Sequence, residues 1–137
     1  MRTDVVLGED GVLHVFNVHL GTSYRERRYQ ARTLLSDEVL NHKEGRGPRI
    51  VVGDFNRWTS GLASRLMRDA FEVVEPNAFL RHARTYPGVL PLLHLDHFYY
   101  DEQLLLRHFR LNRSRKALIA SDHLPLVAES EIEITSA

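Results

Sequence analysis

The chain has 137 residues and a mass of 15.8 kDa, which is the size of one domain with a buried core. Its 43% hydrophobic and 26% charged residues are typical of a globular protein and exclude collagen-like, coiled-coil and disordered classes. The 18 Lys and Arg balance the 18 Asp and Glu, so the overall charge draws the chain neither to nucleic acid nor to an anionic membrane, although a local patch could.

The sequence lacks cysteine and long apolar stretches. It contains no Cys, which excludes disulfides, thiolate zinc sites and a Cys nucleophile. The first ten residues lack the apolar stretch of a signal peptide, and no apolar run approaches the ~20 residues of a membrane span. We therefore expect a cytoplasmic protein with no membrane partner.

The first half of the chain predicts a hairpin, a helix and a strand. Residues 4–7 and 12–20 alternate as two strands around a Gly-rich turn. Ser23 and Glu26 have the spacing of a capping box, and apolar residues at helical spacing behind them predict a helix over 24–41. A break at 45–48 precedes a short buried strand at 49–53.

The second half predicts a helix followed by strands. Apolar residues at helical spacing indicate a helix over 60–70, and three further strands are expected at 93–100, 104–111 and 124–134. The chain is therefore predicted to be of the α/β class, with about six strands and two main helices.

Polar residues gather where predicted strands end, which is where functional sites are commonly built. The four places are Asn17-Val18-His19, Gly53-Asp54-Phe55-Asn56, Leu95-Asp96-His97 and Ser121-Asp122-His123-Leu124-Pro125. If the strand at 49–53 continues, Asp54 and Asn56 point to one side while Phe55 enters the core.

These residue types suit phosphoryl chemistry. A carboxylate beside an amide can orient a water molecule and hold a phosphoryl oxygen, and Mg²⁺ prefers oxygen ligands of this kind. A carboxylate on one ring nitrogen of a histidine fixes its tautomer and raises its basicity, a role that suits Asp96 acting on His123.

Each motif alone also fits ordinary structure. The Asp-x-Asn sequence is a common Asx turn, Asp122-His123 before Pro125 could be a simple loop, and His19 alone fits a strand-end histidine. The other histidines are assigned to structure or surface, His97 least securely because it adjoins Asp96. It is the occurrence of all these motifs in one order that favours a site.

That order resembles the endonuclease/exonuclease/phosphatase superfamily, the deoxyribonuclease-like metal-dependent phosphoesterases. The motifs that carry the resemblance are Asn-x-His-Leu, the helix with Arg28 and Gln30, Gly-Asp-Phe-Asn, Thr85-Tyr86-Pro87, Leu95-Asp96 and Ser-Asp-His-x-Pro. The resemblance covers nearly the whole chain and looks most like small bacterial members of undefined substrate.

The resemblance implies a role for each matching residue. Asp54 would orient the attacking water, Asn56 would bind the scissile phosphate, and His123, paired with Asp96, would contact the same phosphate. His19 would donate a proton or stabilise charge. The resemblance further implies Mg²⁺ or Mn²⁺ held by Asp122 and Asp54, a phosphoester hydrolysed by in-line attack, and substrate contacts from Asn17, Asn56, Arg28 and Tyr86.

The family fold is an α/β sandwich with two layered sheets, and residues 1–137 correspond to a single partial domain, its C-terminal portion. The family's early Asn and its main metal-ligand Glu have no counterpart upstream of Asn17. A sheet without its partner layer exposes an apolar face. We therefore expect completion by a missing N-terminal half or by a homodimer through the exposed sheet face.

Three functions remain open on the sequence. The first is a metal-dependent phosphoesterase, active as an oligomer or with a missing chain. The second is a non-catalytic half-domain that dimerises or binds a partner or a phosphorylated ligand, because loss of the Glu would weaken metal binding. The third is nucleic-acid binding, for which the cationic candidates are Arg25, Arg27, Arg28 and Arg32; these arginines equally make an ordinary solvated helix face.

Overall fold

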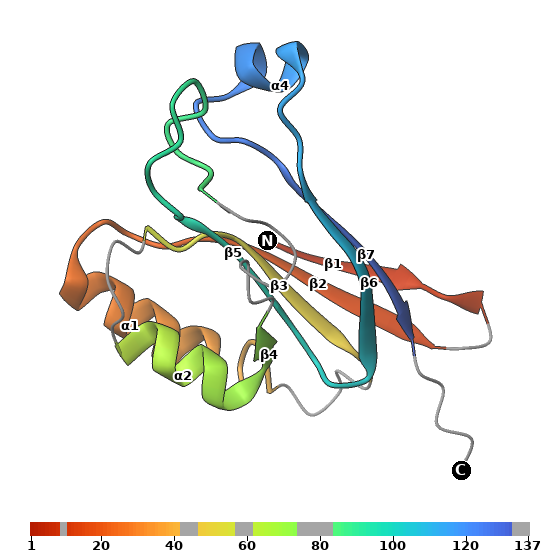
Figure 1. Cartoon of the computed structure of the whole chain (residues 1–137). Coiled ribbons are helices and arrows are strands. Elements are labelled where there is room, and N and C mark those ends of the chain that lie inside the picture. The colour runs from red at the N-terminus through yellow and green to blue at the C-terminus, as the bar shows by residue number, and fades with distance from the viewer. Residues whose placement is uncertain (9–10, 42–46, 57–61, 74–83, 133–137) are drawn as a thin grey trace.

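The computed structural model describes residues 1–8, 11–41, 47–56, 62–73 and 84–132. Their secondary structure confirms the predicted α/β class (Figure 1). The elements are β1 (Arg2–Val6), β2 (Val12–His19), α1 (Tyr24–Leu34), β3 (Arg49–Asp54), α2 (Leu62–Ala70), β4 (Glu72–Val73), β5 (Asp96–Tyr100), β6 (Leu104–Leu111), α4 (Arg115–Ala120) and β7 (Leu126–Ile132).

The strands form two sheets. The larger has the order β1-β2-β3-β5-β4, and the smaller pairs β6 with β7. Strand β2 runs parallel to β3, since α1 connects them, and the other pairs are antiparallel. The predicted hairpin of β1 and β2 is confirmed, with Gly8 and Gly11 at positive φ on either side of its turn.

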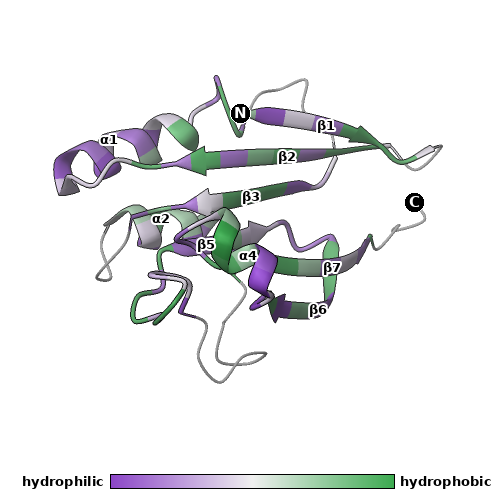
Figure 2. Ribbon diagram, turned by 90° about the horizontal axis from the view of Figure 1, so that it is seen from above, coloured by the Kyte–Doolittle hydropathy of each residue, from purple (hydrophilic) through white to green (hydrophobic). Residues whose placement is uncertain are grey.

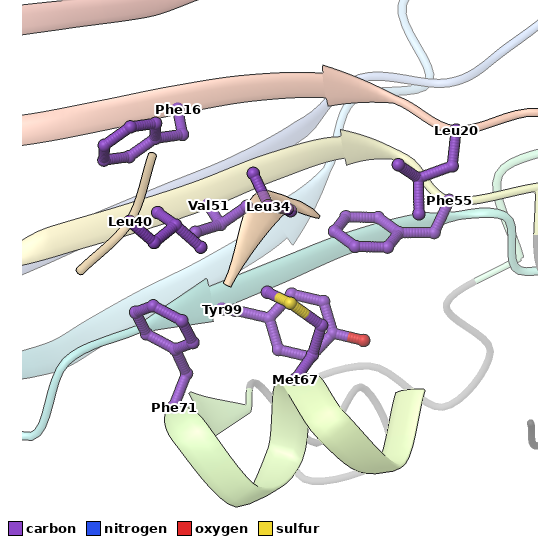
Figure 3. Packing of buried hydrophobic residues seen from close by; sticks show 9 residues of the cluster. All are labelled: Phe16, Leu20, Leu34, Leu40, Val51, Phe55, Met67, Phe71 and Tyr99. Carbon is purple, nitrogen blue, oxygen red and sulfur yellow. The ribbon is translucent and has the colours of Figure 1, made fainter. Parts of the chain in front are cut away.

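One face of the larger sheet is covered by α1 and α2 (Figures 1 and 3). Alternation along the strands sends Phe16, Val51 and Tyr99 to this face, where Leu34 of α1 and Met67 of α2 pack on them. The full cluster is Phe16, Leu20, Leu34, Leu40, Val51, Phe55, Met67, Phe71 and Tyr99. Each fully buried side chain of this kind contributes about 1.5–3 kcal/mol, so this layer holds the sheet in shape.

The opposite face carries the second sheet over part of its area. Phe98 points away from the helices, and its ring lies 6.2 Å from that of Phe109 on β6. Figure 2 shows β6 and β7 beside β5 and away from β1 and β2. Val5, on the same side of the sheet, is therefore left exposed. The predicted open apolar face is thus restricted to the region of β1 and β2.

The first helix departs from its prediction at both ends. It begins after Ser23 as expected, but the Ser23 side chain makes no capping hydrogen bond, so the predicted capping box does not form. The helix ends at Leu34 instead of residue 41. Ser36 Oγ donates to the Thr33 carbonyl at 2.7 Å, and such a side-chain bond competes with continued helix.

Other boundaries shift for local reasons. The strand expected from residue 93 begins at Asp96, because Leu93 forms an isolated bridge with Tyr86. The strand expected from residue 124 begins at Leu126, because the Leu124 N–H donates to the Thr85 carbonyl. Its predicted end at 134 and the predicted helix start at residue 60 lie outside the described residues.

Two short elements were not expected from the sequence. These are β4, which has two residues, and α4, which is capped where Ser114 Oγ accepts from the Ala117 N–H at 3.2 Å. A two-residue strand and a six-residue helix are too short for a periodicity to be read. In the described ranges, no helix has the length and apolar character needed to cross a membrane.

Candidate active site at the strand ends

Three strands of the larger sheet bring polar residues into one row. Parallel β2 and β3 end at the same edge, and antiparallel β5 begins there. His19 is therefore the register partner of Asp54, and Asp54 is the partner of Asp96. Residues in register across neighbouring strands point to the same face, so the row forms although its members are far apart in sequence.

His123 lies between two of these carboxylates. Its Nδ1 is 2.8 Å from Asp96 Oδ2, and its Nε2 is 3.9 Å from Asp54 Oδ2. All three side chains keep some contact with solvent, with exposed fractions of 25% for His123, 21% for Asp96 and 13% for Asp54. The first contact orients the ring, and the second directs Nε2 toward the row of strand ends.

The surroundings of His123 favour its protonated form. Partial burial is the largest single influence on the His123 pKa and lowers it, but the hydrogen bond to Asp96 raises it. The charges of Asp96, Asp54 and Asp122 raise it further, and the net result is a pKa above the ordinary 6.5. An imidazolium at this position can donate a hydrogen bond from each ring nitrogen.

The turn after β3 holds Asn56 in an unusual conformation. The Asn56 N–H donates to Asp54 Oδ1 at 2.7 Å, as in an Asx turn, and Asn56 has a φ of 46°. Its side-chain Nδ2 donates to the Leu20 carbonyl at 2.7 Å and lies 3.4 Å from His19 Nε2. The buried amide therefore ties the end of β2 to the turn, while Phe55 between the two polar residues enters the core as expected.

A cleft opens beside this row. It has a volume of ≈ 360 Å³ and is lined by Asn17, Asp96 and His123, among other residues. Asn17 is exposed and lies two residues before His19, on the same side of β2. The candidate substrate residue Asn17 and the His123 pair thus share one cleft.

The loop that begins at residue 84 reaches the site through Tyr86. Its ring centroid is 4.9 Å from that of His123, with an angle of 45° between the planes. The Thr85 carbonyl accepts from the Leu124 N–H at 2.9 Å, which joins this loop to the segment after His123. Tyr86 therefore contacts the ring that Asp96 orients, as well as belonging to the sequence motif.

Two candidate residues lie apart from these contacts. Asp122 is exposed and acts on His123 through its charge, while its backbone carbonyl accepts from the Gly88 N–H at 2.7 Å. Arg28 is exposed on α1. Among the residues that the structure describes, no group of three or more His, Cys, Asp or Glu side chains is arranged to hold a metal ion.

Several supporting groups had no role assigned from the sequence, although Gly53 and Ser121 belong to its motifs. Gly53 is required because a Cβ there would lie 1.9 Å from the Val18 carbonyl oxygen, and its φ is 133°. Ser121 Oγ accepts from the His123 N–H at 3.0 Å and so positions the backbone of that residue. The Gly before Asp54 and the Ser two residues before His123 were the available signals; the Leu20 carbonyl that receives the Asn56 amide has none.

Comparisons with known proteins identify the family of the chain. Residues 2–123 match the Endonuclease/Exonuclease/phosphatase family. The uncharacterized protein YbhP of Escherichia coli K12 is 36% identical over 119 residues, which is 85% of this chain and 46% of that protein. The chain therefore spans about half the length of the curated relatives it matches.

Solved structures share the fold at low identity. A functionally unknown protein from Enterococcus faecalis has a TM-score of 0.73 and 22% identity, over 93% of this chain and 53% of that one. A mannosyl-6-phosphatase from Bacteroides thetaiotaomicron has a TM-score of 0.70 and 14% identity, over 88% of this chain and 52% of that one. The human Nocturnin catalytic domain with bound sulfate has a TM-score of 0.69 and 19% identity, over 96% of this chain and 52% of that one. With the family match over most of its length, the chain belongs to the endonuclease/exonuclease/phosphatase family.

Proposed function

We propose that this chain carries part of the site of a phosphoester hydrolase, in which His123, held by Asp96, binds and neutralises the reacting phosphoryl group. The observation that supports this most directly is the position of His123 between Asp96 at 2.8 Å and Asp54 at 3.9 Å. The assignment to a family that includes phosphatases and nuclease-like proteins comes from the comparisons.

In this proposal His123 acts as a charged donor. With Nδ1 donating to Asp96, Nε2 of the imidazolium is available for a phosphoryl oxygen. The raised pKa of His123 favours the form that carries this proton. Charge that develops on the phosphoryl oxygens in the transition state would then be offset by a group already oriented.

Proton transfer would use the other members of the row. Asp54 would orient a water molecule and take one of its protons as the water oxygen bonds to phosphorus. His19 would give a proton to the leaving-group oxygen as its bond to phosphorus breaks. Asn56 lies 3.4 Å from His19 and would position that ring as well as contact the phosphate; Asn17, Arg28 and Tyr86 would contact the substrate.

A divalent metal is the part of the family pattern for which the described residues provide no complete set of ligands. Asp54 Oδ1 already accepts the Asn56 N–H, and Asp122 is exposed, so these two carboxylates fall short of a three-ligand site within the described residues. We propose that Mg²⁺ or Mn²⁺ is bound when ligands from outside the described residues join Asp54 or Asp122. Mg²⁺ commonly uses one or two protein carboxylates together with substrate phosphate and water.

The open face over β1 and β2 indicates where such ligands would arrive. We propose that it is covered by the remaining half of a family domain or by a second copy related by a two-fold axis. Light scattering at decreasing concentration tests the second arrangement. A cooperatively folded monomer at high dilution would contradict the homodimer.

Hydrolysis of bis-p-nitrophenyl phosphate and of p-nitrophenyl phosphate, with Mg²⁺, Mn²⁺ or EDTA, tests the proposed function. We expect metal-dependent release of nitrophenol, reduced about 10²–10³-fold in Asp54→Asn. Asp4→Asn is the matched control, because Asp4 also contacts a histidine but lies away from the site. A folded protein of known oligomeric state that is inactive with both metals would instead support the non-catalytic alternative. The lack of a three-ligand cluster among the described residues favours that alternative.

A further inference from the structure

Above the site, a surface forms that combines apolar and basic side chains. It consists of residues 87–92 and 113–120, which we call the tip; the second segment includes α4. Figure 1 shows the loop and α4 together, beyond the ends of the strands. The Gly88 N–H donates to the Asp122 carbonyl at 2.7 Å, and Leu118 Cδ2 lies 3.6 Å from the Cβ position of Gly88. The two segments therefore form one surface.

The apolar side chains of the tip face solvent. Val89 is 88% exposed, Ile119 76% and Leu90 65%, and Leu92 and Leu118 are also exposed. The loop is held by its own hydrogen bonds, from the Leu90 N–H to the Pro87 carbonyl and from the Leu92 N–H to the Tyr86 carbonyl. Large apolar groups gathered on an ordered surface mark an interaction site.

The charge of the tip is of one sign. Its charged residues are Arg113, Arg115 and Lys116, all exposed, and the nearest exposed carboxylate along the chain, Asp122, lies two residues beyond it. Because the whole chain has 18 cationic and 18 acidic residues, removing these three leaves 15 against 18 for the remainder. The zero net charge therefore conceals a positive tip on a negative body.

Cations and apolar groups share the outward side of α4. Ala117 is buried, so the residues two positions to either side of it, Arg115 and Ile119, point away from the molecule. Figure 2 shows hydrophilic and hydrophobic colours next to each other on this helix. An apolar group flanked by Arg and Lys matches the boundary of an anionic bilayer, where apolar side chains enter the acyl region and cations contact headgroup phosphates.

We propose that the tip docks on an anionic lipid surface. Single-stranded nucleic acid fits less well, because the tip has no Phe, Tyr or Trp on which bases could stack. Docking would bring the surface close to the site, since Tyr86 immediately precedes the tip and His123 follows it. If the proposed hydrolase function holds, the phosphoester that reaches His123 is one carried by a lipid headgroup.

Vesicle sedimentation tests the docking without relying on activity. The full chain is mixed with vesicles of phosphatidylcholine and phosphatidylglycerol in equal parts, or of phosphatidylcholine alone. We expect sedimentation with the anionic vesicles, weakened as NaCl is raised. The variants Leu90→Ser/Ile119→Ser and Arg115→Glu/Lys116→Glu should each reduce binding about tenfold or more. Val6→Ser, an exposed apolar residue on β1 outside the tip, should not.

Thermal unfolding of each variant should match the parent, because all the substituted side chains are exposed. The proposal would be overturned if the parent sedimented equally with and without vesicles, or if both tip variants bound vesicles as well as the parent does. A tip that binds a protein partner would give the first of these results. Hydrolysis of soluble bis-p-nitrophenyl phosphate is measured in parallel. Vesicle binding without hydrolysis would contradict the proposed function alone, and hydrolysis without vesicle binding would contradict the docking alone.

Discussion

Two histidine–carboxylate pairs in this molecule have the same contact distance and different surroundings. His14 Nδ1 lies 2.8 Å from Asp4 Oδ1, and His123 Nδ1 lies 2.8 Å from Asp96 Oδ2. The first pair joins register partners of the hairpin formed by β1 and β2. The second joins a strand start to a loop 27 residues later.

The neighbours of each pair decide what it can do. Asp4 also accepts from Arg2 Nε at 2.8 Å, so the first pair includes a permanent cation. The hydrogen bond from Arg2, more than that from His14, lowers the Asp4 pKa below its ordinary 3.8. The other ring nitrogen of His123 instead faces a second carboxylate, that of Asp54. A histidine–carboxylate distance alone therefore does not distinguish the two pairs; unbalanced charge beside an open cleft is what makes the His123 pair the candidate site.

The largest effect that separates the pairs should be on hydrolysis. We expect His123→Ala to reduce it about 10²–10⁴-fold with little change in Tm, because the side chain is a quarter exposed. His14→Ala removes a buried ring and should destabilise the fold by about 1–3 kcal/mol while leaving activity per folded molecule unchanged. Rate assays and thermal melts of both variants measure this, and the reverse pattern would assign catalysis to His14.

A smaller effect is expected on the titration of His123. Asp96→Asn removes a charge and a charged hydrogen-bond acceptor that raise the His123 pKa, so that pKa should fall, since burial still lowers it. Asp4→Asn should leave it unchanged. NMR titration of the His123 ring in both variants gives the comparison, and equal shifts would mean that the contact with Asp96 does not set the pKa.

The smallest effect is on stability as a function of pH, and it has opposite signs for the two pairs. Since the His123 pKa is raised, the contribution of its protonated form to the free energy of unfolding is complete below pH 6.5. That contribution is lost as pH rises through the pKa of the folded state. Since the Asp4 pKa is lowered, the contribution of its ionised form to the free energy of unfolding is present above pH 3.8. That contribution is lost as pH falls through the pKa of the folded state.

Thermal melts should therefore show the Tm difference between the parent and His123→Gln narrowing above about pH 6.5. The difference between the parent and Asp4→Asn should narrow below about pH 4. A His123→Gln difference that widens with rising pH would show that His123 is neutral in the folded protein.

Several features of the fold could be predicted because they depend on local pattern. The hairpin, the start of α1, the bounds of β6 and the inward position of Phe55 all follow from alternation or helical spacing near each residue. The predicted end of α1 was wrong because the Ser36 hydroxyl donates to the helix carbonyl of Thr33, a contact that hydrophobic periodicity does not reveal. The predicted start of β5 was wrong because Leu93 forms an isolated β-bridge with Tyr86.

By itself the sequence determined which residues stand at the strand ends and in which order, because strands are read from alternating side chains and polar motifs from adjacent letters. The sequence also suggested that Asp96 acts on His123, and their contact bears this out. Tertiary structure alone decided that Asp54 and Asp96 lie in register and that His123 also faces Asp54. It also decided that a neutral chain carries a positive, apolar tip beside them. The physical reason is that register, burial and local charge depend on which strands become neighbours, and that is set by the packing of the whole core.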